Sequence, residues 1–433
     1  MVAFFTPARV KSSSPWETIY IPSLFSTVGE IELSGNSTNA RVSLLFAILA
    51  VSAFSLDGRF GSTGPAIKDW HALGELYRGR ATKRLKCSLQ DLSSGRPKKE
   101  KYKDILMALL SMVTICVVSG QMRHSAHYLR DIEEIINLYG LQKAIASNKV
   151  RMLHGIYLYL RVFTEHTCVV NEPSQGAVEV PRDSPSRPSS TWNQLLGLSP
   201  PFPDTNTPEL GLILGQKAGG SALEDIYSIP QSLFELIFQT TQMAGEIQRL
   251  QNDGREQVTD HDSFAAKVKD LENNICGWGH QTHDGVYRPF CSTVRPRREC
   301  FPYHVVQAVH KALIIYFYRC VRDVNAAILQ PYVQQTIQHL QEYDKQKKMS
   351  SDRSSNTCWP GFIAGCEALD PHLREEYAKW LERSGQSTGI QMFNVALEAV
   401  QKVWYARSFP GTQNAPWTRV LSRFSELRVL VLS

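Results

Sequence analysis

The segment that decides the fold reads LRDIEEIINLY and runs from Leu129 to Tyr139. Apolar side chains recur in it at steps of three, four and three positions, at Leu129, Ile132, Ile136 and Tyr139. Charged or amide side chains fill most of the positions between them. Because an α-helix turns once in about 3.6 residues, this spacing places the apolar side chains on one face. The segment therefore predicts an amphipathic helix that buries a single stripe.

Helical signals, either the same 3/4 spacing or a nearly continuous apolar run, cover much of the chain. We predict helices over 101–118, 148–166, 233–250, 304–340, 374–381 and 393–403. The second half of the first of these is nearly all apolar (ILMALLSMVTICVV), which predicts burial on most sides. Pro230 fits a first helical turn, whereas Pro331 should break or kink the long helix over 304–340. Strand-like alternation is scarce, so we predict an all-α fold.

One stretch does not fit a core. The range 171–208 holds eight prolines and many serines, and it has too little apolar surface to bury. We therefore predict an N-terminal helical half over 1–170, a Pro/Ser/Gly-rich mobile linker over 171–222 and a C-terminal helical half over 223–433. No internal repeat of 20 to 50 residues is apparent, so a regular solenoid is not supported.

The composition is that of a soluble globular protein inside a cell. Apolar residues make up 43% of the 433 residues and charged residues 20%, which argues against a mainly disordered chain. The longest uncharged apolar run, Val42 to Leu56, is shorter than the ~20 residues that a membrane span needs. The first residues, MVAFFTPARVK, do not have the pattern of a secretory signal. Nine scattered cysteines indicate reduced thiols.

The net charge of +6 is concentrated in one place. Ten basic and two acidic side chains lie between Arg78 and Lys103, so this stretch carries +8 and the rest of the chain −2. A protein that grips nucleic acid along its whole surface would be basic in many places. The distribution favours a local basic element on a slightly acidic body.

That basic stretch resembles a bipartite nuclear-import signal. It divides into KRLK, nine further residues and RPKKEKYK, and the candidate residues are Lys83, Arg84, Lys86, Arg96, Lys98, Lys99, Lys101 and Lys103. The alternative is that these side chains are the solvated first turns of two helices. Cations near a helix N-terminus are disfavoured by a few tenths of a kcal/mol, which favours an exposed recognition loop. The sequence therefore predicts a nuclear protein.

A weak metal candidate consists of thiol and imidazole side chains at short spacings: Cys276, His280, His283 and Cys291. Sulfur and imidazole ligands suit zinc, but the pattern C-x3-H-x2-H-x7-C matches no standard zinc site. An ordered loop with incidental thiols and histidines explains the same residues. We assign no metal ligand to the chain on this pattern.

A second polar group lies on the predicted helix that decides the fold. His127, Asp131 and Glu134 are spaced i, i+4 and i+7, so they share a face that could hold a metal or perform acid–base chemistry. This face is opposite the apolar stripe. We therefore expect the three side chains to face water.

Motifs for other chemistry are absent or incomplete. GLILGQK, over 211–217, is one residue short of a phosphate loop and lacks the following hydroxyl. The chain contains no G-x-S-x-G, H-E-x-x-H or G-x-G-x-x-G. It also lacks the C-x2-C-x6-C pattern that holds two zinc ions in fungal regulators. We predict no catalytic residue and no cofactor in this chain.

Eight segments taken together resemble the fungal-specific transcription factor regulatory domain, in the branch of the arginine-metabolism regulators. In chain order they begin with PWETIYIPSLFSTVGEIELSG at Pro15, SLLFAILAVSAFSLD at Ser43, KKEKYKDILMALLSMVTICVVSG at Lys98 and HYLRDIEEIINLYGL at His127. They continue with KVRMLHGIYLYLRV at Lys149, IYSIPQSLFELIFQTTQMAGEI at Ile226, ALIIYFYRCVRDVN at Ala312 and WPGFIAGCEA at Trp359. The resemblance covers the chain from about Pro15 to near its end, except for the Pro/Ser-rich stretch.

The resemblance implies an all-helical regulatory and dimerisation module of a nuclear regulator, with no catalytic residues. Members of the branch usually carry an N-terminal binuclear zinc cluster, and the residues before Pro15 are too few to hold one. We therefore expect a homo- or heterodimer with a related transcription factor that reaches promoter DNA only indirectly, without a membrane. Its targets would be a metabolic or secondary-metabolite gene set.

Two other functions remain open from the sequence. One is a non-catalytic helical scaffold or co-regulator that acts only through protein partners, and the other is a metal-dependent helical enzyme. The large aromatic residues of the C-terminal half would be the first anchors of a partner if they were exposed: Trp359, Trp380, Trp404 and Trp417. We expect them to lie in the core.

Overall fold

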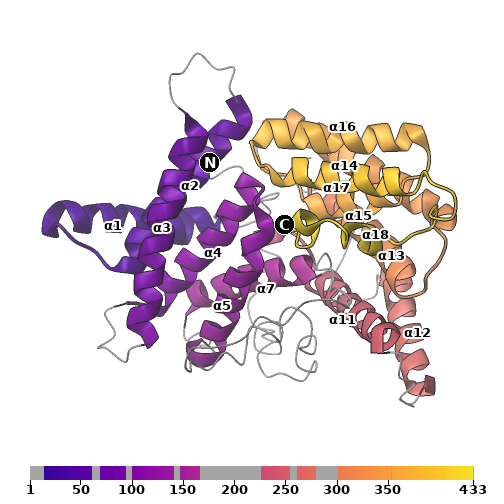
Figure 1. Cartoon of the computed structure of the whole chain (residues 1–433), viewed down its shortest axis with the longest axis horizontal. Coiled ribbons are helices and arrows are strands. Elements are labelled where there is room, and N and C mark those ends of the chain that lie inside the picture. The colour runs from indigo at the N-terminus through magenta and orange to yellow at the C-terminus, as the bar shows by residue number, and fades with distance from the viewer. Residues whose placement is uncertain are drawn as a thin grey trace, which may run out of the picture.

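The computed structural model describes residues 14–60, 69–93, 100–140, 147–165, 226–253, 261–278, 301–352 and 354–432. Within these ranges every regular element is a helix and there is no strand (Figure 1). The predicted all-α fold is therefore confirmed. The predicted linker, 171–222, and the loop over 211–217 lie outside the described residues. The division into domains stays a prediction.

The N-terminal half packs its helices around one central helix. Its elements are η2 (Trp16–Tyr20), α1 (Ile21–Ser34), α2 (Asn39–Phe60), α3 (Trp70–Ser93), α4 (Tyr102–Ser119), η4 (Met122–His124), α5 (Ser125–Tyr139) and α7 (Asn148–Glu165). Helices α2, α3, α5 and α7 all contact α4. As a result, α4 is buried from Tyr102 to Val118 apart from two partly exposed side chains, and not only in its second half as the sequence predicted.

Two of these helices are long and apolar enough to cross a membrane by length and composition. They are α2 and α4, each with a mean hydropathy of 1.7 over an 18-residue window. The apolar run from Val42 to Leu56 lies inside α2, which extends beyond it at both ends and is 22 residues long. However, 61% of the α2 window and 78% of the α4 window are buried inside the structure, where the two helices pack on each other. This burial is typical of core helices.

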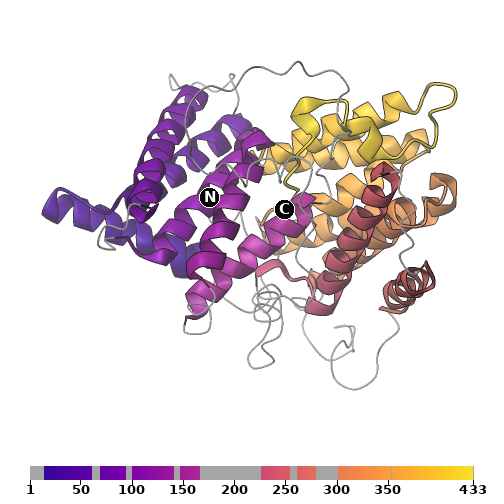
Figure 2. The same ribbon diagram turned by 60° about the horizontal axis from the view of Figure 1, so that its bottom comes forward.

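The C-terminal half is a second group of packed helices (Figures 1 and 2). Its elements are α11 (Gln231–Asp253), α12 (His261–Gly277), α13 (Phe301–Cys320), η7 (Ala326–Leu329), α14 (Gln330–Ser350), α15 (Cys358–Cys366), α16 (Pro371–Thr388), α17 (Met392–Ala406), α18 (Trp417–Leu421) and η8 (Ser425–Leu427). Trp359, Trp380 and Trp417 are buried in this half. Trp404 is half-buried, and its indole N–H donates to the carbonyl of Gly365 at 2.8 Å. The expectation that these residues belong to the core is confirmed.

The predicted helix over 304–340 is wrong in one respect. The chain leaves the helix after Cys320 and resumes an α-helix at Gln330, so the break precedes Pro331 rather than occurring at it. The cause is local, because Asp323 has a left-handed backbone with φ of 48° and Asn325 caps the next turn by accepting from the Ala327 N–H. Pro331 then sits in the first turn of α14, where proline is tolerated.

The two halves share one hydrophobic core. The ring of Tyr159 in α7 stacks on that of Tyr227, before α11, with centroids 3.5 Å apart. Phe163 of α7 contacts Trp359 of α15 edge-on, at 5.1 Å between centroids. Near the end of the chain, the Val431 N–H donates to the sulfur of Met122. Aromatic and main-chain contacts therefore join the halves at several separate points.

Two glycines also bring the backbones of the two halves close together. A Cβ atom built at Gly58 of α2 would overlap the carbonyl group of Gly389, which follows α16, and a Cβ at Gly389 would overlap the carbonyl oxygen of Ser55. Gly389 also has a left-handed backbone with φ of 71°. Both positions therefore need glycine, because backbone meets backbone there without an intervening side chain.

Candidate functional site

The first block of the predicted import signal lies on a folded helix. Lys83, Arg84 and Lys86 are exposed on α3, whereas Ala81 before them and Leu85 among them are buried. The block lies in the second half of α3, so it is not the first turn of a helix. Its side chains are accessible to solvent, but its backbone groups are part of the α3 helix.

The second block leads into α4. Lys101 is exposed directly before α4 and Lys103 is partly buried in its first turn. Arg96, Lys98 and Lys99 lie outside the described residues. Lys101 and Lys103 therefore lie at the start of a helix, which was the alternative to an exposed recognition loop. The role of either block in import stays a prediction.

Both blocks are attached to the start of α2. The Glu100 carboxylate accepts the N–H groups of Asn39 and Ala40, at 2.8 and 2.9 Å. Arg84 donates to the side-chain oxygen of Asn39 at 3.2 Å. A carboxylate at this position caps α2 and interacts favourably with its dipole. Arg84 of the first block and Glu100, which lies within the second, are therefore both bonded to the start of α2.

An ion-paired arginine near the start of α2 joins it to α1 and α4. Arg41 of α2 pairs with Glu30 of α1 and, at 2.9 Å, with the buried Asp104 of α4. Hydrogen bonds from Ser37 and Arg41 lower the pKa of Glu30. The carboxylate is thus ionised at neutral pH and links α1 to α2.

Only one residue of the candidate metal group lies in the described part of the chain. Cys276, near the end of α12, is exposed, and its Sγ lies 3.6 Å from the hydroxyl oxygen of Tyr318. That hydroxyl donates to Glu272 at 2.9 Å. His280, His283 and Cys291 lie outside the described residues. Among the described residues, no group of three or more His, Cys, Asp or Glu side chains could hold a metal ion.

The three polar residues of α5 lie mostly in water, as predicted. His127 and Glu134 are exposed and Asp131 is partly buried. Burial raises the pKa of Asp131 to about 6, and the neighbouring Glu134 carboxylate adds to this rise. The group therefore contains a carboxylate that takes up a proton in mildly acidic solution, on the surface of the N-terminal half.

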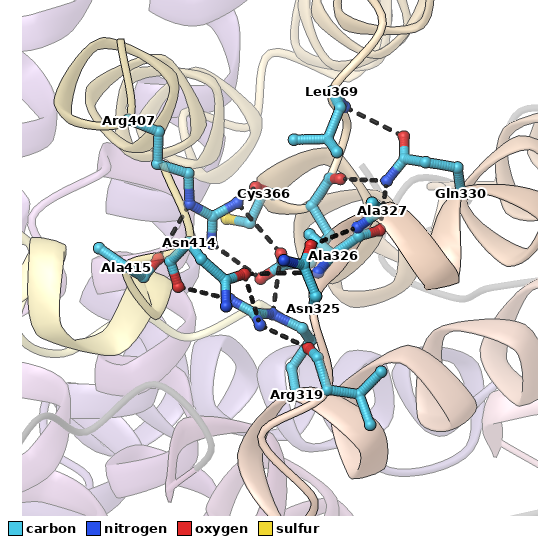
Figure 3. A network of polar contacts seen from close by, with 12 residues as sticks. Arg319, Asn325, Ala326, Ala327, Gln330, Cys366, Leu369, Arg407, Asn414 and Ala415 are labelled. Atoms are coloured by element: carbon cyan, nitrogen blue, oxygen red, sulfur yellow. Dashed lines mark hydrogen bonds and ion pairs between the residues drawn. The ribbon is translucent and has the colours of Figure 1, made fainter. Parts of the chain in front are cut away.

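Sequence reasoning missed a fully buried ion network in the C-terminal half (Figure 3). Glu367, just after α15, pairs with Arg319 of α13 at 3.0 Å and with Arg407, just after α17, at 3.0 Å. Arg407 also reaches the second carboxylate oxygen, at 3.1 Å. All three side chains are excluded from water. The network joins three helices through a single carboxylate.

The remaining donors of the two arginines end on main-chain and amide oxygens. Arg407 donates to the carbonyls of Ala415 and Cys366, at 2.9 and 2.7 Å. Arg319 donates to the carbonyl of Val324 at 2.6 Å, and to the side chain and carbonyl of Asn414 at 3.1 and 3.2 Å. The network therefore positions the segment around Asn414.

The signal for this network in the sequence is faint. Residues 319, 367 and 407 are 48 and 40 positions apart, and none of them belongs to a motif. Arginine and glutamate are mostly found on protein surfaces, so their types alone predict exposure. The one available hint is that Glu367 directly follows the apolar segment WPGFIAGC, where a charge needs a partner.

Two histidines form a further polar pair between α13 and α14. The Nδ1 atoms of His304 and His339 are 3.0 Å apart, and the ring of Tyr303 packs edge-on against both. Burial lowers the pKa of His339 to about 4, with the charges of His304 and Lys311 adding to the shift. Both rings are therefore neutral at pH 7 and share one hydrogen bond.

Comparison with known proteins places these features in a family context. The profile of a family described as "Fungal specific transcription factor domain" matches residues 2–430. The chain is also 25% identical, over an alignment of 458 residues, to "Arginine metabolism regulation protein II" of Saccharomyces cerevisiae. The alignment covers 92% of this chain and 51% of that protein, so the chain spans about half the length of this relative. No solved structure is significantly similar.

Proposed function

Because this chain belongs to the fungal-specific transcription factor domain family, we propose that it is the regulatory module through which a transcriptional regulator controls a metabolic or secondary-metabolite gene set. The observation that carries this proposal is the family match, which extends over nearly the whole helical body. The name of the relative supports a metabolic gene set, since that protein regulates arginine metabolism. The proposal requires no catalysis and no cofactor from this chain.

The proposed module acts by contact with macromolecules in the nucleus. It works as a homo- or heterodimer with a related transcription factor and reaches promoter DNA through that assembly. The charge distribution supports this, because outside residues 78–103 the chain carries a net −2, which suits protein contacts better than phosphate contacts. The exposed basic side chains of α3 and of the start of α4 serve import into the nucleus.

The transcriptional role is tested by changing the amount of this protein in its own organism. Deletion of its gene should alter the transcripts of a defined metabolic gene set, and expression of the chain should restore them. Overexpression should shift the same transcripts in the opposite direction to deletion. Transcript levels that do not respond to either change would refute the role and favour a non-transcriptional scaffold.

Import is tested separately with a fluorescent fusion. Replacing Lys83, Arg84 and Lys86 by alanine should reduce nuclear accumulation. A matched control replaces three exposed lysines of the other half, Lys345, Lys348 and Lys379, which removes the same charge. Nuclear accumulation that survives the first triple change, or is lost equally in the second, would contradict a specific import role for α3.

A further inference from the structure

Helix α1 presents an apolar face to solvent. Phe25 is 71% exposed, Val28 41% and Leu33 91%, whereas Thr27 on the opposite face is fully buried. Both views show α1 at the edge of the molecule, with its C-terminal part projecting beyond α2 and α3 (Figures 1 and 2). Large apolar side chains gathered on one exposed helix face are a mark of an interaction site.

The orientation of α1 is fixed by the rest of the fold. At its start, Trp16 and Tyr20 are buried and their rings stack with centroids 4.6 Å apart. Further along, Glu30 is paired with Arg41 of α2. The apolar face is therefore held outward by a helix that is anchored at both ends of its inner side.

Gly29 lies in the middle of this outer face. It is helical, and a Cβ atom added there would meet nothing within 4 Å. Glycine inside a helix costs about 1 kcal/mol relative to alanine, and neither the backbone conformation nor the packing of this chain requires it. What glycine does provide is space for a second backbone to approach closely.

We propose that the outer face of α1 binds a second copy of this chain, with the two α1 helices antiparallel about a two-fold axis at Gly29. Phe25 and Leu33 lie four positions on either side of Gly29. In this arrangement Phe25 therefore lies opposite Leu33 of the partner subunit, as a symmetric contact requires. The inference rests on the proposed function for its biological role, since it supplies the surface of the proposed dimer.

The polar residues of the face agree with this pairing. Ser26 and Glu32 lie three positions on either side of Gly29 and are both exposed, so each hydroxyl lies opposite a carboxylate that can accept its hydrogen bond. Glu32 is the one charged residue on this face, and the two copies of it lie on opposite sides of the axis. Because α1 is only about 21 Å long, the buried area is small and we expect a reversible dimer.

The first test is sedimentation velocity of the full chain over a wide range of protein concentration. The wild-type chain should shift from a 48.8 kDa monomer towards a dimer as the concentration rises. Gly29→Gln should keep it monomeric. Gly79→Gln on α3 is the matched control, since a Cβ there also meets nothing within 4 Å, and it should dimerise like the wild type.

The second test fixes the arrangement. Phe25→Glu or Leu33→Lys alone should weaken the dimer, whereas the double variant should restore it, because each new carboxylate then lies opposite a new ammonium. A double variant no stronger than the single ones would rule out the antiparallel pairing. A wild-type chain that stays monomeric at all concentrations, or pairs only with a related factor, would reject self-association. The proposed function would still stand or fall by the transcript experiment.

Discussion

Glu367 carries the one negative charge between two buried guanidinium groups. It forms an ion pair with Arg319 and accepts hydrogen bonds from Arg407, and neither arginine can turn to water because both are buried. Removing one member of such a group is costly, since the charges left behind are uncompensated in a medium of low dielectric constant. Glu367 is therefore important for stability because its loss would leave two buried positive charges without a negative partner.

We accordingly expect Glu367→Gln to lower the free energy of unfolding by about 3–5 kcal/mol, the range found when one partner of a buried pair is removed. Urea unfolding followed by circular dichroism measures this change. Glu375→Gln is the control, because Glu375 pairs with Lys379 on the exposed side of α16. A variant at position 367 with the wild-type midpoint would show that the network contributes little to stability.

The glycine contact between the halves gives a second prediction. Gly389→Ala combines an unfavourable positive φ with overlap of the Ser55 carbonyl. Gly411→Ala has the positive φ alone, since nothing lies within 4 Å of an added Cβ there. We expect a loss of about 1–2 kcal/mol for Gly411→Ala from the conformation, and a clearly larger loss for Gly389→Ala. Equal losses would mean that the close approach of the two backbones does not contribute to stability.

His154 makes stability depend on pH. It is buried in α7 with Nε2 2.7 Å from the Tyr102 hydroxyl oxygen, and burial lowers its pKa from 6.5 to about 4. Between these values the unfolded chain binds a proton that the folded chain does not. The contribution of this residue is therefore complete above pH 6.5 and is lost as the pH falls to about 4.

The corresponding experiment compares His154→Gln with the wild type at pH 7.5 and pH 5. The wild type should lose about 2 kcal/mol more than the variant between these pH values, as expected for one proton taken up on unfolding. His372→Gln, on the exposed start of α16, should follow the wild type. A pH dependence identical in all three proteins would exclude His154 as the cause.

At the scale of helices, the sequence pattern was most informative where one stripe is buried. The 3/4 spacing correctly predicted α5, α11, α16 and α17, because each has a clear apolar face, whereas α7 was predicted from its content of Leu, Tyr and Val. Helix α3 was not predicted, since its apolar positions are interrupted by a run of basic residues and by two glycines. One of these, Gly74, is explained only by the tertiary structure, in which the ring of Phe54 lies 2.7 Å from an added Cβ.

The cap on α2 provides a prediction at this scale. Glu100→Gln removes the charge that two N–H groups of α2 share, so the first turn should fray and the chain should lose about 1 kcal/mol of stability. Hydrogen exchange of the Asn39 to Val42 amides measures the fraying. Glu134→Gln, on the surface of α5, serves as the control. Unchanged exchange in the Glu100 variant would assign the start of α2 to packing alone.

At the scale of the whole molecule, neither half is a closed unit. Contacts between α2 and α16, α4 and α17, and α7 and α11 join them, and the core is continuous across the junction. The sequence showed a compositional break at 171–208 but could not show this packing, because the contacting residues are far apart in the chain. For the same reason the network around Glu367 was not predicted.

This continuity predicts the outcome of cutting the chain. If a protease site is inserted between residues 171 and 222 and cleaved, the two fragments should elute together from a size-exclusion column in native buffer. They should separate only when denaturant is added. As a control, the same insertion should leave the uncut chain at the wild-type elution volume. Fragments that part without denaturant would show that the junction is weak.

The meeting of Gly58 and Gly389 also bears on how the halves move. Side chains usually form a yielding layer between helices, because they can change rotamer as the helices shift. Here the two backbones touch directly. At this contact, α16 can therefore shift against α2 only if the backbone itself moves, because there is no side chain that could change rotamer to absorb the displacement.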